Sequence, residues 1–276
     1  MFNADGRIPS LDLASRNSRT RRGRFAACVL LLSSIFVVSP IVPVDLRSDV
    51  PILSQVLPQL EPVSATATCA QGGVCVVGDT GPGGGKVFYV HASGTFNCGV
   101  AFTSTCKYLE VAPSGWNTGA DPTKLWAVFA NKDADIATIT NDSPAYNNAL
   151  GIGLGYKNSL AIVNQGNDTT TAAGAARAYA GGAKSDWYLP TTAELNLLCQ
   201  WARNVAQSVT TRCTGGTLNT GTGASGGFSS DRYFSSSERS DAIAWMQNFA
   251  NTGTVGDQDT SAKSSVRSVR PVRAFG

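Results

Sequence analysis

The cysteines are the residues whose spacing first suggests a defined chemistry. Six of the seven form close pairs along the chain: Cys69 and Cys75, Cys98 and Cys106, Cys199 and Cys213. Several connectivities are open to six cysteines, but pairing between sequence neighbours closes the shortest loops and is the one we expect. The alternative is a zinc site, yet the Cys-x2-Cys spacing is missing and His91 is the only histidine. We predict three disulfides, each stabilising the fold by about 2–3 kcal/mol.

Three arginines near the C-terminus form a second candidate site. Arg267, Arg270 and Arg273 recur at every third residue, with valines between them. In one continuous strand, Arg267 and Arg273 share a face and Arg270 points to the other, unless Pro271 introduces a bulge. One interpretation is a binding site for sulfated or acidic glycans, whose oxygens pair with guanidinium groups. The other, which we favour, is that these arginines hold the last strand by pairing with Asp or Glu elsewhere.

Aromatic residues supply the third candidate site. Trp116, Asn117 and Trp126 lie in a segment rich in Asn, Asp and Gly, a composition that often lines carbohydrate sites. Packing in the core is an equally good explanation for both tryptophans. Trp187 and Trp245 are expected in the core, and Trp201 half-buried.

The sequence gives no clear catalytic, metal or cofactor site. Gly78 to Gly85 is rich in glycine, but Val87 follows Lys86 and a β-rich segment comes next, so it is a turn and not a phosphate loop. His91 is expected to be an ordinary, partly exposed histidine on that strand. Asp257-Gln258-Asp259 is expected to be a solvated turn, with cation binding as the alternative. We therefore predict no catalytic residue, no metal and no cofactor.

The N-terminal residues determine the expected compartment. Residues 1–24 are a basic segment with six arginines and two acids, so residues 25–276 together carry a net charge of only −1. An apolar run, 25–44, follows and contains Cys28; this order predicts a signal peptide or a membrane anchor with the arginines inside. Residues 45–68 contain three prolines and are expected to be a linker. We expect everything beyond them to be exported, with the membrane contacted only through residues 25–44 if they are not cleaved.

Composition excludes some kinds of protein for the chain beyond residue 24. Hydrophobic residues make up 42% of the protein, which is enough for a core and excludes wholesale disorder. Charged residues are only 15%, and the part beyond the basic segment has no positive surplus. Nucleic-acid binding by a broadly basic surface is therefore disfavoured. Residues 69–276 have the size of one domain.

The pattern of elements predicts an α+β fold. Strands are expected over 86–91, 108–112, 233–236, 243–249 and 266–275. Helices are expected from Asn158 or Ser159 to Val163, over 170–180, and after Thr191, which forms a capping box with Glu194. The last helix carries its apolar stripe at Leu195, Leu198, Cys199 and Ala202. Residues 214–230 are expected to form a long surface loop.

Four motifs in order give the chain a family resemblance. They are Gly78-Asp79-Thr80-Gly81-Pro82-Gly83-Gly84-Gly85-Lys86-Val87-Phe88-Tyr89-Val90, Asp186-Trp187-Tyr188-Leu189-Pro190-Thr191 with Glu194-Leu195, Tyr233-Phe234-Ser235-Ser236-Ser237-Glu238 with Trp245, and Val269-Arg270-Pro271-Val272-Arg273-Ala274-Phe275. Together they resemble the DUF1566 family, found at the C-terminus of the Legionella collagen-like adhesin. Phe234 stands where the family more often has Trp, and no collagen-like stalk precedes the domain. The resemblance implies an exported bacterial protein with a C-type lectin-like domain of short strands, two to three helices and long loops, which the predicted disulfides would staple.

Three functions follow as expectations. The first is an exported, non-enzymatic binding or adhesion domain, extracellular or on the cell surface, that recognises glycans or a surface polymer. The second is an enzyme like the formylglycine-generating enzymes, whose fold the resemblance also implies; it needs a redox-active cysteine pair near the C-terminal core, and the last cysteine here is Cys213. The third is a structural protein of the cell envelope. Calcium-dependent sugar binding by C-type lectins uses a Glu-Pro-Asn or Gln-Pro-Asp loop followed by Trp-Asn-Asp. Neither tripeptide of the loop occurs here, and Trp116-Asn117 is followed by Thr118.

Overall fold

A computed structural model describes residues 66–139, 151–223, 225–250 and 256–276. All described residues belong to one compact unit of the chain. The predicted export segment 25–44 and most of the predicted linker lie outside the described residues. Within the described ranges no helix has both the length and the apolarity needed to cross a bilayer.

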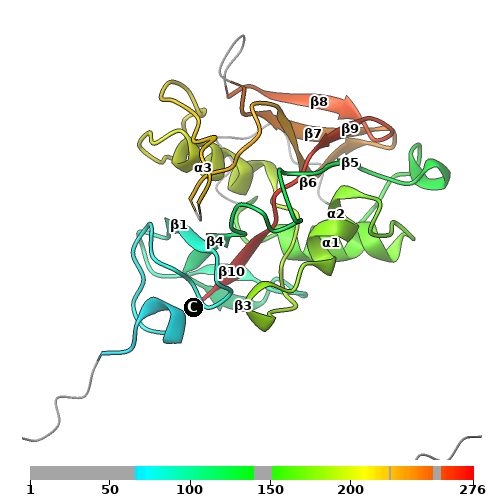
Figure 1. Cartoon of the computed structure of the whole chain (residues 1–276). Helices are drawn as coiled ribbons and strands as arrows, with labels where there is room; N and C mark the ends of the chain where they lie inside the picture. Colours follow the sequence, from blue (N-terminus) through cyan, green and yellow to red (C-terminus); the bar gives the residue numbers. More distant parts are fainter. Residues whose placement is uncertain (1–65, 140–150, 224, 251–255) are drawn as a thin grey trace, which may run out of the picture. The chain divides into compact units, whose positions relative to one another are not determined.

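The described residues form three sheets and three α-helices (Figure 1). The three-stranded sheet has the order β1-β4-β10, the two-stranded sheet pairs β2 with β3, and the five-stranded sheet has the order β5-β9-β6-β7-β8. The strands are β1 (Lys86–Val90), β2 (Phe96–Cys98), β3 (Ser104–Cys106), β4 (Tyr108–Val111), β5 (Thr123–Leu125), β6 (Arg232–Ser240), β7 (Ile243–Asn248), β8 (Gln258–Ala262), β9 (Val266–Ser268) and β10 (Val272–Phe275). The mixed helix-and-sheet architecture is as predicted.

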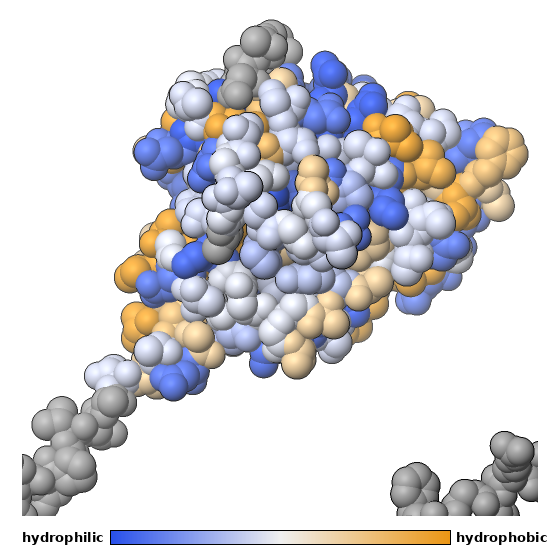
Figure 2. All heavy atoms as spheres, viewed as in Figure 1, coloured by the Kyte–Doolittle hydropathy of each residue, from blue (hydrophilic) through white to orange (hydrophobic). Residues whose placement is uncertain are grey.

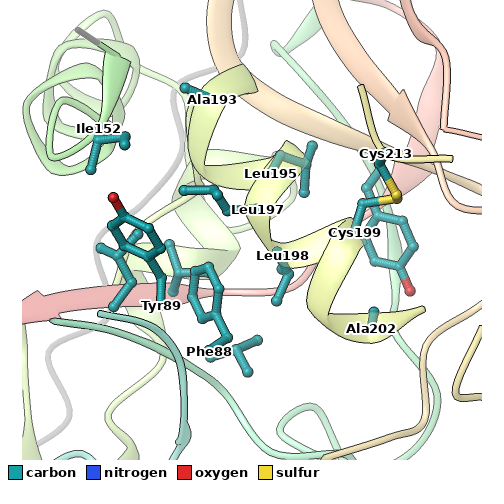
Figure 3. Close-up of a cluster of buried hydrophobic side chains, with 14 of the residues drawn as sticks. Phe88, Tyr89, Ile152, Ala193, Leu195, Leu197, Leu198, Cys199, Ala202 and Cys213 are labelled. Atoms are coloured by element: carbon teal, nitrogen blue, oxygen red, sulfur yellow. A yellow bond between two sulfur atoms is a disulfide. The ribbon is translucent and has the colours of Figure 1, made fainter. Parts of the chain in front are cut away.

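Helix α3 (Thr192–Ala202) is the central element of the largest core cluster (Figure 3). Its capping box is confirmed: the Glu194 amide donates to Thr191 Oγ1 at 3.2 Å, and the Thr191 amide donates to Glu194 Oε2 at 2.8 Å. The predicted apolar stripe is buried, and Leu197 packs in the same cluster. The helix is therefore covered on nearly all sides, which a single stripe did not predict.

Two of the predicted helices begin or end at residues other than those predicted. Helix α1 (Gly155–Asn164) begins before Asn158 and Ser159, which are buried within it and do not cap it. Glycine is needed at its first residue, Gly155, because a Cβ there would lie 2.4 Å from the Tyr188 ring and 2.5 Å from Glu194 Oε2. Helix α2 (Ala172–Ala178) is shorter than predicted and starts after Thr171, whose hydroxyl accepts from the Gly174 amide.

The C-terminal segment is not the single strand that the sequence suggested. Pro271 separates β9 from β10, and the two strands belong to different sheets. The expectation that Arg267 and Arg273 share one face is therefore wrong. The expected turn at residues 257–259 is also wrong, because Gln258 and Asp259 open strand β8. Strands β2, β3 and β5 were not predicted at all.

Three disulfides join the cysteines as sequence neighbours, the pairing that we expected. Cys69–Cys75 lies beside the three-stranded sheet, Cys98–Cys106 spans the β2–β3 pair, and Cys199–Cys213 lies in the main core (Figure 3). All six cysteines are at most 7% exposed. The pairs fit an oxidising, extracellular environment.

The glycine-rich turn packs closely on the core. The Gly83 amide donates to both carboxylate oxygens of Glu110, at 3.0 and 3.1 Å. A Cβ at Gly83 would lie 2.6 Å from both Glu110 Oε1 and the Trp187 ring. Glycine is required here because no side chain fits between the turn and these two groups.

Candidate functional site

A surface cleft of about 330 Å³ contains two of the residues singled out in the sequence, Trp116 and Asn117. They lie in the loop between β4 and β5 and face the C-terminal end of α2. Both aromatic side chains in the cleft, Trp116 and Tyr179, are half-buried. The cleft is lined by Trp116, Asn117, Lys124, Thr169, Ala175, Ala178, Tyr179 and Ala180.

The rings of the cleft are held by aromatic packing. The Trp116 and Tyr179 ring centroids lie 5.6 Å apart with the planes 75° apart, an edge-to-face contact. The centroid of Tyr179 lies 5.0 Å from that of the fully buried Trp187. Burial raises the pKa of the Tyr179 hydroxyl, which therefore stays neutral and can donate or accept hydrogen bonds.

A buried polar network fixes the indole of Trp116. Its Nε1–H donates to Asp121 Oδ1 at 2.9 Å. The same oxygen accepts from Arg270 Nε at 2.5 Å, and Asp121 Oδ2 accepts from the Tyr233 hydroxyl at 2.5 Å. Burial and the neighbouring Asp121 raise the pKa of Tyr233 well above its usual value, so this hydroxyl stays a donor. Trp116 is thus a preorganised ring and not a freely moving one.

The loop that carries Asn117 has an unusual backbone conformation. Thr118 has φ +62°, which a β-branched residue rarely adopts. Its amide donates to Gly115 O at 2.9 Å and its hydroxyl to Asn117 O at 2.6 Å, so the turn is held in place. Strained residues of this kind concentrate at ligand sites. Here the turn leaves the Asn117 side chain exposed at the edge of the cleft.

Lys124 reaches the cleft from β5. Leu125, the next residue, forms a parallel bridge with Thr171 at the start of α2. This bridge places β5 beside the helix and brings the half-buried Lys124 next to Thr169. Lys124, Thr169 and Tyr179 were missed in the sequence because β5 and the end of α2 carry no motif.

Trp126 does not belong to the cleft. Its side chain is fully buried, and its Nε1–H donates to Ser235 O at 2.9 Å. The ammonium of Lys263 lies 4.7 Å from the ring centroid and pairs with Glu238. Trp126 is a core residue that directly follows β5, and it is inaccessible to a ligand.

The three arginines of the tail separate in space. Arg270 is 2% exposed and, besides Asp121, donates to carbonyls of Ala112 and Gly227. Arg273 is 8% exposed and pairs with Glu110 at 2.6 Å and Asp186 at 2.5 Å. These pairings match the interpretation that the sequence favoured, in which arginines hold the last strands. Arg270 and Arg273 are thus not available as ligand residues.

Arg267 is half-buried on β9 and lies directly across from Lys124 on β5. Its Nε–H points to Met246 Sδ at 3.4 Å, and its Nη1 donates to Val266 O at 2.7 Å. It is the only one of the three tail arginines for which the described residues provide no carboxylate within ion-pair distance.

A second hollow, of about 310 Å³, lies between the β2–β3 pair and α1. Its walls include the Cys98–Cys106 disulfide, Tyr156 and Asp186. The Asp186 carboxylate already accepts from Arg273, and the guanidinium of Arg177 lies 4.3 Å from the Tyr156 ring centroid. Because its acid and its ring are already paired with arginines, this hollow is a weaker candidate.

Two features of the sequence could suggest catalysis, a serine motif and the histidine His91. Gly223-Ala224-Ser225-Gly226-Gly227 has the Gly-x-Ser-x-Gly spacing of hydrolase nucleophiles, which we did not recognise in the sequence. It lies in the loop between α3 and β6, whereas such a nucleophile needs a strand-to-helix turn. The imidazole Nδ1 of His91 lies 3.0 Å from the Tyr89 hydroxyl. Among the described residues no three His, Cys, Asp or Glu side chains are grouped to hold a metal ion.

The cleft is therefore a fixed aromatic and polar surface with one lysine. No protein-family model and no curated protein matches this chain. The similarity to the DUF1566 family accordingly stays a prediction from four sequence motifs.

Proposed function

We propose that residues 69–276 are an exported, non-enzymatic binding domain of the DUF1566 type with a C-type lectin-like fold. Its ligand is a saccharide, as part of a glycan or surface polymer, bound in the cleft between Trp116 and Tyr179. The observation that carries the proposal is that a preorganised, half-exposed indole shares one cleft with Asn117, Lys124 and Thr169. A sugar ring needs an apolar face to stack on and polar groups for its hydroxyls, and this cleft offers both.

The surface and the disulfides support this proposal. On the face seen in Figure 2, hydrophobic residues occur in small groups among hydrophilic ones, without one continuous apolar patch. On this face, such a pattern favours recognition in a local cleft over broad hydrophobic association. The three disulfides fit the extracellular location that the N-terminal segment predicts.

The enzyme alternative has less support. A formylglycine-generating mechanism needs a cysteine pair that substrate can reach. Cys199, on α3, is joined to Cys213, and both are fully buried (Figure 3). No specific observation favours the structural envelope protein over the binding domain.

A glycan array with the purified full-length chain, followed by titration of the best ligand, tests the proposal. We expect Trp116→Ala to weaken binding at least about tenfold, or roughly 1.4 kcal/mol, because the stacking surface is lost. The matched control is Phe129→Ala, which removes a ring that is 83% exposed and does not line the cleft. Its affinity is expected to stay within a factor of about two.

Two results would contradict the proposal. One is no binding to any saccharide by the folded protein, judged folded by its near-ultraviolet circular dichroism. The other is equal loss of affinity in the Trp116 and Phe129 variants, which would place the site elsewhere.

A further inference from the structure

The ammonium of Lys124 lacks the compensation that the buried cations of the domain receive. Lys263, Arg270 and Arg273 each pair with a carboxylate. Lys124 is half-buried in the cleft, and within the described residues its ammonium has neither an ion pair nor a hydrogen bond. A positive charge held at the wall of a cleft is a feature that an anionic ligand would satisfy.

The acids nearest the cleft are already engaged. Asp121 pairs with Arg270 and accepts from Trp116, so its charge is neutralised below the cleft. Asp168 accepts from the Thr170 amide at 2.8 Å and from the Thr170 hydroxyl at 2.5 Å. These bonds lower the pKa of Asp168, with a smaller contribution from the charge of Lys124. The Asp168 carboxylate thus bonds to Thr170 in the same turn and forms no ion pair with Lys124.

A second cation stands directly opposite Lys124. Lys124 on β5 and Arg267 on β9 are partners in an antiparallel register. Residues in this relation project to the same face of the sheet, with Cβ atoms about 4.5–5.5 Å apart, and like charges there are destabilising. Arg267 extends toward Met246 on β7 and has no carboxylate within ion-pair distance among the described residues. An anion at this edge would relieve the repulsion between the two cations.

We infer that the ligand of the cleft is an anionic saccharide whose carboxylate or sulfate group is recognised by Lys124, with Arg267 adding positive potential. This inference rests on the proposed function, and it names the chemical class of the ligand. The sugar ring stacks on Trp116, and the acidic group on the ring pairs with the ammonium of Lys124. Lys124 is therefore the residue that determines the preference for charged over neutral sugars.

The test compares saccharides that differ only in charge, using the full-length chain. Polygalacturonate and hyaluronan are each compared with their methyl-esterified forms, and dextran sulfate with dextran, so that carboxylate and sulfate are tested separately. We expect at least one acidic form to bind about tenfold more tightly than its neutral partner at low salt. Lys124→Met should remove this difference, so that the variant binds the acidic and the neutral form with affinities within about twofold of each other. Lys107→Met is the control, because Lys107 is half-buried outside the cleft beside Tyr108.

The outcomes separate the inference from the proposed function. Equal binding of charged and neutral forms overturns the inference and leaves saccharide binding intact. A charge preference that survives Lys124→Met, or that Lys107→Met removes equally, also overturns it, because the preference then reflects diffuse charge. If Trp116→Ala leaves binding of the acidic form unchanged, the cleft is not the site and both fail.

Discussion

At the residue scale, Asp121 supports the proposed site without lining it. Its carboxylate joins three side chains from distant parts of the sequence: Trp116, Tyr233 and Arg270. Of these partners, only Trp116 reaches the cleft. Arg270 therefore affects the cleft indirectly, by holding the carboxylate that holds the indole.

We predict that Asp121→Asn loosens Trp116. The amide keeps one acceptor oxygen but leaves the buried Arg270 without a carboxylate, which should lower the free energy of unfolding by about 3–5 kcal/mol. Tryptophan fluorescence should shift to longer wavelength and ligand affinity should fall, since the indole is no longer fixed. Arg273→Lys is the control: it should cost stability through Glu110 and Asp186 but leave binding unchanged. Equal effects of both variants on binding would show that Asp121 has no positioning role.

At the element scale, the start of α3 depends on a buried carboxyl group. Glu194 is fully buried, and it accepts from the Thr191 and Gly153 amides and from the Tyr188 hydroxyl. Burial raises its pKa from 4.5 to about 7, although these hydrogen bonds act in the opposite direction. The helix cap thus changes protonation near neutral pH.

The raised pKa of Glu194 predicts a defined pH dependence of stability. The folded state holds the proton on Glu194 more tightly than the unfolded state. The protonated carboxyl therefore adds to the free energy of unfolding, and this contribution is fully present below about pH 4.5. It is lost as the pH rises through the folded value of about 7, and the total loss is about 3 kcal/mol. Glu194→Gln keeps a capping-box residue but cannot ionise. Denaturant unfolding should be measured for wild type and Glu194→Gln from pH 4 to 8. The free energy of unfolding of the wild type should fall relative to that of Glu194→Gln as the pH rises, and a constant difference between the two would contradict the prediction.

The elements that the sequence predicted are those whose signal is local. The capping box at Thr191, the glycine turn before β1 and the cysteine pairs each depend on residues at most 14 positions apart. Strand β5 (Thr123–Leu125) and strand β8 (Gln258–Ala262) are largely polar, so no alternation marks them. The cleft was half predicted, because Trp116 and Asn117 stand out by composition whereas Lys124 and Tyr179 reach it only through tertiary packing. The roles of Arg270 and Arg273 depend on acids 149 and 163 positions away.

At the scale of the whole molecule, the disulfides differ in how much they are expected to stabilise the fold. Cys199–Cys213 closes a separation of 14 residues and is part of the main core. Cys69–Cys75 closes a separation of 6 residues in a small cluster beside Tyr108 and Phe275. A longer loop restrains the unfolded chain more, and a buried sulfur pair also contributes packing.

We predict that replacing both Cys199 and Cys213 by Ser lowers the free energy of unfolding by at least about 3 kcal/mol. The matching Cys69 and Cys75 double variant should lose less, because its loop is shorter and its surroundings hold fewer core side chains. Urea unfolding of both variants at one pH gives the comparison. A greater loss in the Cys69 and Cys75 variant would contradict this order.

The long-range pairing of Glu110 with Arg273 and of Asp121 with Arg270 also determines when the domain can finish folding. Glu110 and Asp121 lie in the first half of the chain, and their guanidinium partners are among its last residues. Until Arg270 and Arg273 emerge from the ribosome, or from a translocation channel, both acids lack the cations they need for burial. Strand β4 likewise waits for β10 to complete its sheet. The domain is therefore completed only once residues 270–275 are available, and not segment by segment from its N-terminal side.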